Sequence, residues 1–227
     1  MLRTARLVAG KDLRVELRGR VVTNQVLPFA LLVLVLFAFA LDPDRGVLRT
    51  ATPGLYWVAV LFTLVVAVQR SSGLEQSDGT RDALRLSGLD PAGVFLGKAA
   101  SLALMLVVVE LVLGLGIVVL YDAELLGAGA LLLGVTVVVT SAALAATGTL
   151  YGALTGSIRG RETLLPLLLL PVVAPVLIGA TRASEAALGT GGAGTSEGWP
   201  WVGLLAVFAL IYIASGLLAY GALLEEA

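Results

Sequence analysis

Six stretches of about 20 predominantly apolar residues dominate this chain and leave little polar sequence between them. They cover roughly 22–41, 52–70, 94–121, 126–155, 162–181 and 200–224 of the 227 residues. A helix needs about 20 such residues to cross the hydrocarbon core of a bilayer. Because lipid offers the backbone no hydrogen-bond partners, apolar runs of this length are expected to be helical. The sequence therefore predicts an all-α integral membrane protein with six transmembrane helices in a single domain, residues 1–227.

The composition agrees with this class. Hydrophobic residues make up 58% and charged residues 14% of the chain, whereas about a quarter of the residues of a soluble domain are charged. Ala38-Phe39-Ala40 matches the small-x-small pattern of a signal-peptide cleavage site. A signal peptide carries only a short basic region before its apolar run, and here about 20 patterned residues come first. We therefore expect the first span to be retained.

The placement of lysine and arginine predicts the orientation, because cytoplasmic loops of membrane proteins are enriched in both. With the N-terminus inside, twelve of the 15 basic residues fall on the cytoplasmic side. The three on the outer side are Arg45, Arg49 and Arg182. The prediction is N-in/C-in, with residues 73–93 in the cytoplasm and 182–199 in an outer loop that ends near Trp199 and Trp201.

Missing residue types exclude several functions. The chain has no cysteine and no histidine, so it cannot form a disulfide, a thiolate metal site or a Ser-His-Asp triad. It also lacks a Gly-x-x-x-x-Gly-Lys-Ser/Thr phosphate loop. We expect no catalytic, cofactor-binding or metal-binding residues in this chain, and its net charge of −1 gives no indication of nucleic-acid binding.

Residues 1–20 have the pattern of an amphipathic interfacial helix. On a helical wheel an apolar sector holds Leu2, Ala5, Ala9, Leu13 and Leu17, opposite a basic group formed by Arg3, Lys11, Arg14 and Arg18. Such a helix lies in the inner interface with its arginines toward the headgroups. Asp12 and Glu16 interrupt the division. The helix either only anchors the topology or also contacts a cytoplasmic partner.

Small residues and prolines mark two later spans. Gly148, Gly152 and Gly156 are four residues apart and share one helix face, where backbones can approach closely. They serve either packing within the chain or a subunit interface. Pro166, Pro171 and Pro175 each remove a helix hydrogen bond, so we expect the fifth span to be kinked or broken.

Glu110 is the one acid well inside a span. A charge at a helix centre costs roughly 2.5–3.5 kcal/mol on insertion scales, so this carboxyl is expected to face protein or water. Two interpretations stand: a functional group within the membrane, or a partner in a buried interhelical hydrogen bond.

This arrangement resembles the permease subunits of ABC exporters of the ABC-2 type, and particular residues resemble the CcmB family of haem-exporter permeases. The similarity is carried by ATPGLYWVAVLFTLVVAVQRSSGLEQSDGTRDALRLSGLDPAGVFLGK. The family pattern is matched by Pro53, Gly54, Trp57, Val58, Arg70, Asp78, Gly79, Thr80 and Lys98. Arg159-Gly160, LLPLLLLPVVAPVLIGA and KDLRVELRGR also fit. Ser72, Glu75 and Arg81 depart from the family pattern.

The resemblance implies a partnership rather than a self-sufficient transporter. It implies two copies of this permease, two copies of a CcmA-like subunit that binds ATP, CcmC-like and CcmD-like membrane proteins, and a CcmE-like haem chaperone. Haem is then the handled ligand, and the location is the cytoplasmic membrane of a bacterium or archaeon. Two rival functions are an exporter permease for a lipid, peptide or drug, and a scaffold that transmits ATPase motion without transport.

Residues 73–93 are assigned to coupling with that ATPase. Asp78 or Thr80 can cap a short helix, and Gly88 with Asp90-Pro91 can end it. Leu84 then forms an apolar knob flanked by charged residues. The residues assigned to coupling are Arg70, Glu75, Asp78, Gly79, Thr80, Arg81, Asp82 and Leu84. The alternative is a solvated loop with an incidental helical turn.

The absence of histidine and cysteine gives a direct test. Met1 and Met105 are the only methionines, and tyrosine is the remaining axial ligand type for haem iron. We expect the purified chain, incubated with haem, to give no absorption spectrum of a histidine-ligated haem. The appearance of such a spectrum would contradict the prediction that a partner ligates any haem handled here.

Overall fold

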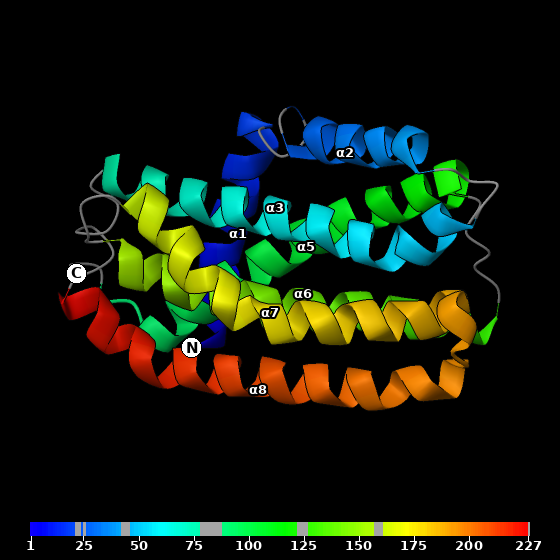
Figure 1. Ribbon diagram of the computed structural model, residues 1–227. Helices are drawn as coiled ribbons and strands as arrows, with labels where there is room; N and C mark the ends of the chain where they lie inside the picture. The colour runs from blue at the N-terminus through cyan, green and yellow to red at the C-terminus, as the bar shows by residue number, and fades with distance from the viewer. Residues whose placement is uncertain are drawn as a thin grey trace.

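The computed structural model describes residues 1–20, 24, 26–41, 46–77, 88–121, 127–156 and 161–226. Regular structure in these ranges is helical, so the all-α prediction is confirmed for them. The helices are α1 (Leu2–Gly19), α2 (Leu27–Ala40), α3 (Val47–Ser77), α5 (Pro91–Tyr121), α6 (Ala128–Thr155), α7 (Arg161–Leu188) and α8 (Thr195–Glu226), with a 3-10 turn, η3 (Thr190–Gly192). Figure 1 shows the long helices side by side and α1 running across them.

Five of these helices are long and apolar enough to cross a membrane. The candidate spans are Val47–Ser71, Pro91–Val119, Ala128–Thr155, Thr163–Leu188 and Thr195–Leu224. Their 25 to 30 residues correspond to about 38–45 Å of helix. This exceeds the roughly 30 Å of a hydrocarbon core. The chain is therefore a multi-pass membrane protein.

The first predicted span is the exception. Helix α2 has 14 residues, or about 21 Å at 1.5 Å per residue, which is short of a full crossing. It begins beside Pro28, and a proline fits the first turn of a helix because its missing N–H has no partner to lose there. The structure thus gives five candidate spans among the described residues and does not establish the sixth.

Helix α6 is the centre of the bundle and contacts α3, α5, α7 and α8. Residues 143–148 in its middle, ALAATG, are all buried. Small residues let neighbouring helices approach closely where lipid supplies no hydrophobic drive for association. At Gly148 a Cβ would come within 2.8 Å of Val68 Cγ2 on α3. This glycine therefore lies at a helix contact within the chain.

Helix α1 is seated on the first turns of α5, across two glycines. A Cβ at Gly93 would come within 2.7 Å of Thr4 Cβ, and one at Gly97 within 2.6 Å of the Ala5 carbonyl oxygen. Thr4 and Val8 are the buried residues of α1. The bundle-facing side is therefore rotated from the predicted apolar sector, whose end members Leu2 and Leu17 are 80% and 75% exposed. Gly93 and Gly97 of α5 explain the shift, because the absence of side chains there leaves room for Thr4 and Val8.

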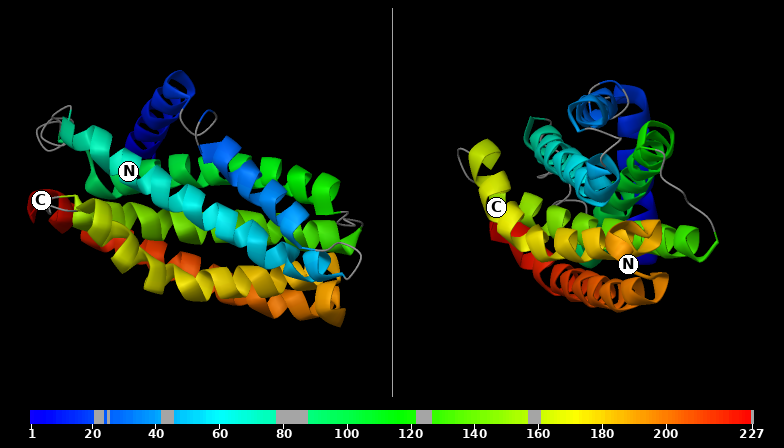
Figure 2. Two further views of the ribbon diagram at one scale, coloured as in Figure 1. Left: turned by 45° about the horizontal axis from the view of Figure 1, so that its top comes forward. Right: turned by 45° about the vertical axis from the view of Figure 1, so that its right-hand side comes forward.

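Helix α7 is continuous through its three prolines. It changes direction along its length in both Figure 1 and Figure 2, so the predicted span is bent and not broken. The predicted outer loop 182–199 is also corrected. Helix α7 continues to Leu188 and α8 starts at Thr195. Hydrogen bonding explains the early start, because the Glu197 carboxylate accepts the Gly194 N–H at 3.3 Å.

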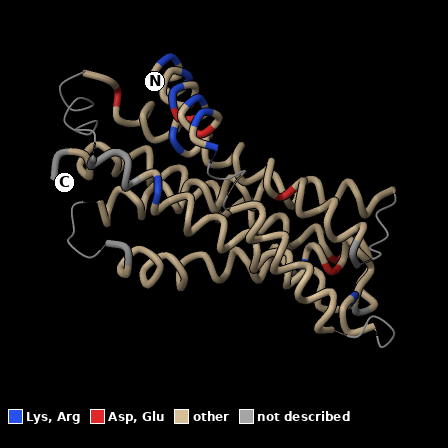
Figure 3. The backbone as a smooth tube through the Cα atoms, turned by 90° about the horizontal axis from the view of Figure 1, so that it is seen from above, with Lys and Arg blue, Asp and Glu red and all other residues tan. Residues whose placement is uncertain are grey.

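The two chain termini lie toward the same end of the bundle (Figure 1). Most of the basic residues in Figure 3 belong to α1 at that end. Arg70 near the end of α3 and Lys98 near the start of α5 share it, whereas Arg49 and Arg182 lie at the opposite helix ends. For the basic residues that the structure describes, the predicted division thus corresponds to the two ends of the bundle.

Two glycines of α6 provide a matched test of this packing. Gly148→Val places a side chain against Val68 and Leu64, and overpacking of this kind costs typically about 1–3 kcal/mol. Gly134→Val, on the same helix, has nothing within 4 Å of its new Cβ. We expect thermal unfolding in detergent to occur at a clearly lower temperature for Gly148→Val only. Equal effects of the two substitutions would contradict the packing described here.

Candidate functional site

Some of the predicted coupling residues lie on α3, and the others lie beyond its last residue, Ser77. Arg70 and Glu75 lie on α3, which continues as a helix through Gly73–Ser77. The other coupling residues lie outside the described residues; they are Asp78, Gly79, Thr80, Arg81, Asp82 and Leu84. The helix α3 extends six residues beyond its candidate span, or about 9 Å. The predicted segment therefore follows a helix that projects past the apolar part of the bundle.

Helix α5 begins at a capped turn. The Asp90 carboxylate accepts the N–H of Gly93 at 3.2 Å, and Pro91 is the first residue of α5. An acidic cap followed by proline is a typical helix beginning. Asp90-Pro91 thus begins α5, whereas the sequence interpretation used the pair only to end the preceding segment.

Helix α1 contacts the helices on both sides of that segment. It packs on α5 at Gly93 and Gly97, and its last residue Gly19 lies beside the guanidinium of Arg70 on α3. A Cβ at Gly19 would come within 2.9 Å of Arg70 Nη2. Cations are favourable near a helix C-terminus, where carbonyl groups are unpaired. Arg70 therefore connects the end of α3 to the end of α1.

The acids that interrupted the amphipathic pattern lie toward the bundle. Asp12 is partly buried, and its Oδ1 forms an ion pair with Lys11 Nζ at 3.0 Å. Its carboxylate also acts electrostatically on Lys98 of α5. Lys98 is 7% exposed. Burying a lysine is costly without an opposite charge nearby, so Asp12 supports Lys98. Glu16 is also partly buried, and no acid is among the residues that line the outward groove of α1.

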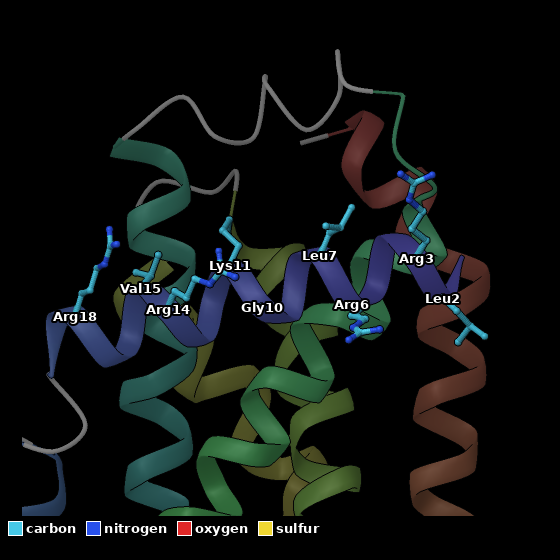
Figure 4. Close-up of a pocket in the computed structure, with 9 residues that line it drawn as sticks. All are labelled: Leu2, Arg3, Arg6, Leu7, Gly10, Lys11, Arg14, Val15 and Arg18. Carbon is cyan, nitrogen blue, oxygen red and sulfur yellow. The ribbon is translucent and has the colours of Figure 1, made fainter.

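That outward face carries a basic groove (Figure 4). Its lining residues all belong to α1: Leu2, Arg3, Arg6, Leu7, Gly10, Lys11, Arg14, Val15 and Arg18. It includes the four basic residues predicted for the interfacial helix, Arg3, Lys11, Arg14 and Arg18, and adds Arg6. All five basic residues are exposed.

A second polar site lies inside the bundle around Glu110. This residue is 1% exposed, and its Oε2 accepts a hydrogen bond from Ser141 Oγ on α6 at 2.7 Å. The Tyr56 hydroxyl on α3 donates to the Glu110 carbonyl oxygen at 3.0 Å. Three helices therefore meet at this residue. Among the described residues, Glu110 Oε1 has no hydrogen-bond partner.

Next to this cluster, Trp57 connects α3 to α7. Its indole Nε1 donates to Ser184 Oγ at 2.9 Å, and its ring packs edge-on against Tyr56 with centroids 5.1 Å apart. Trp57 was singled out in the sequence as part of a motif. Tyr56, Ser141 and Ser184 were missed, although a hydroxyl within an apolar run is a usable signal, because it needs a partner inside the membrane.

The fold and these two sites define a multi-pass helical membrane protein with a basic helix across one end and a polar cluster inside. The family described as CcmB protein matches residues 3–226. The chain is 31% identical over 183 residues to "Heme exporter protein B" of Bradyrhizobium diazoefficiens, covering 78% of this chain and 79% of that one. It is 31% identical to the protein of the same name from Pseudomonas aeruginosa, covering 80% and 81%. The corresponding Haemophilus influenzae protein is 30% identical, covering 78% and 79%.

This chain belongs to the CcmB protein family, and the family resemblance read from the sequence is confirmed.

The Glu110–Ser141 pair can be tested by a double-mutant cycle. Ser141→Ala leaves a buried carboxyl oxygen without its donor, at a cost of about 1–3 kcal/mol. In a Glu110→Leu background the same change should cost much less, because the acceptor is gone. The control is Ser101→Ala, whose hydroxyl bonds only the Lys98 carbonyl of its own helix. Equal losses of unfolding free energy in both backgrounds would show that the two side chains do not interact.

Proposed function

We propose that this chain is the membrane-embedded permease subunit of a haem-exporting ABC complex that serves cytochrome c maturation. The observation that carries the proposal is the family match over residues 3–226, together with relatives named "Heme exporter protein B". Hydrolysis of ATP belongs to a separate CcmA-like subunit. Haem is a handled ligand and not a resident cofactor of this chain.

In the proposed topology the end that holds α1 faces the cytoplasm, with both termini inside. The basic residues gathered there support this orientation. The sixth crossing is the predicted span 22–41, which contains α2. The membrane is the cytoplasmic membrane of a bacterium or archaeon, and the complex contains a second copy of this chain with CcmC-like, CcmD-like and CcmE-like partners.

Coupling is assigned to the segment between α3 and α5. Three features support this proposal: α3 projects beyond its span, α5 restarts at a capped turn, and α1 touches both helices near the segment. A partner that moves the segment therefore acts on two spans at once. Arg70 and Lys98 then hold the ends of α3 and α5 to α1.

The Glu110 cluster lies where α3, α5 and α6 meet, so it joins α6 to both helices that flank the coupling segment. We assign it the role of holding these helices in register while the segment moves. The bent helix α7, joined to α3 through Trp57 and Ser184, extends the same connection to the opposite end of the bundle.

Replacing Leu84 by Asp tests the docking assignment. Loss of a buried apolar anchor costs about 2 kcal/mol or more of binding, or about a 30-fold weaker association. We expect the ATPase subunit to co-purify poorly with Leu84→Asp, while membrane insertion is unchanged because no span is altered. Leu84→Met, which keeps an apolar side chain, should retain association. Full co-purification and cytochrome c maturation with Leu84→Asp would show that the segment does not dock as proposed.

A further inference from the structure

The orientation of α1 restricts what its outward face can contact. The helix runs across the direction of the long helices in Figure 1 and Figure 4. If those helices cross the bilayer, α1 lies along the membrane surface, the position of an interfacial amphipathic helix. Its inner side is occupied by α5. The outward face is therefore presented to what surrounds the protein at the level of the lipid headgroups.

The charge on that face is of one sign. Arg3, Arg6, Arg14 and Arg18 are exposed, and within the described residues no acid pairs with any of them. Lys11 is held by Asp12, whose carboxylate also acts on Lys98 in the bundle. Arg3 and Arg18 are 15 positions apart on the helix, or about 22 Å. This is a row of cations without compensating charge.

The groove has a centre that lacks a side chain. In Figure 4 Arg3, Leu7, Lys11, Val15 and Arg18 project to one side and Leu2 and Arg6 to the other, while Arg14 lies across the helix toward Lys11. Gly10 lies between the two rows, and a Cβ built there would meet nothing within 4 Å. A phosphate at this position could be approached by the cations at positions −4, +1 and +4, which are Arg6, Lys11 and Arg14.

Apolar side chains share the face with these cations. Leu2 is 80% and Leu7 60% exposed, and both line the groove. A free phosphate or a nucleotide would leave these leucines in water, whereas a phospholipid supplies an anionic headgroup and acyl chains together. Each Lys or Arg near an anionic membrane surface contributes about 1 kcal/mol.

We propose that the outward groove of α1, centred on Gly10, binds the phosphate of an anionic phospholipid headgroup, with the exposed leucines against its acyl chains. The inference rests on the proposed topology in placing α1 at the cytoplasmic interface. It goes further by naming a selective site for one class of lipid. The arginines and the open space at Gly10 form the site. The nearest acid, Asp12, acts on Lys98 of the bundle.

The test titrates dioleoylphosphatidylglycerol or dioleoylphosphatidylcholine into the full chain in detergent, with bound lipid counted by native mass spectrometry. We expect the anionic lipid to bind preferentially. Arg6→Gln/Arg14→Gln should weaken that binding about 30-fold, since each arginine is worth about fivefold. Arg49→Gln/Arg182→Gln removes two cations at the opposite end of the bundle and should have no effect. Gly10→Leu keeps every charge but fills the groove, so it should also weaken binding.

Several outcomes would overturn the proposal. Equal binding of the two lipids to the wild-type chain would show that there is no selective lipid site. The same conclusion would follow if Arg6→Gln/Arg14→Gln and Gly10→Leu both bound phosphatidylglycerol as tightly as the wild-type chain does. Displacement of the lipid by millimolar inorganic phosphate would assign the groove to a free anion. Loss of the ATPase subunit from Arg6→Gln/Arg14→Gln in lipid-free detergent would make the face a protein contact. Since Leu84→Asp leaves α1 intact, failure of the coupling assignment and failure of the lipid site are separable.

Discussion

Close approach of helix backbones is the condition on which the rest of this structure depends. Lipid is as apolar as a leucine side chain, so helices in a membrane gain little by burying leucines against one another. Packing and interhelical hydrogen bonds must hold them together. In this bundle glycine lies where neighbouring helices touch: Gly97 under α1, Gly148 against α3, and Gly216 of α8 against the ring of Phe95 on α5. The Glu110–Ser141 and Trp57–Ser184 hydrogen bonds span helices that packing has brought together.

The same principle places α1. Two glycines in the first turns of α5 let its backbone lie against that helix, and Asp12 and Lys98 share a partly buried contact. The outward side then keeps its arginines. One helix thus joins three parts of the proposed mechanism: the membrane surface, the end of α3 through Arg70, and the start of α5. The proposed coupling segment connects α3 and α5 in the sequence.

Periodicity and composition were sufficient to predict the helical class and most of the spans, because a run of 20 apolar residues has few alternatives in lipid. The family was also identified from Trp57, Arg70 and the residues that follow them. The side of α1 that meets the bundle could not be predicted from the helical wheel, since it depends on glycines in a helix about 90 residues further along the chain. The partner of Glu110 was missed for a similar reason: nothing local to Ser141 indicates that it faces α5. The extension of α7 beyond residue 181 and the early start of α8 depend on hydrogen bonds at the chain reversal between them.

The central claim is that this chain serves haem export for cytochrome c maturation. The most direct measurement is deletion of its gene in the source organism, followed by quantification of covalently bound haem in c-type cytochromes by haem staining after denaturing electrophoresis. The account predicts that covalent haem c is lost and is restored by the wild-type gene. Normal amounts of c-type cytochromes in the deletion strain would contradict it.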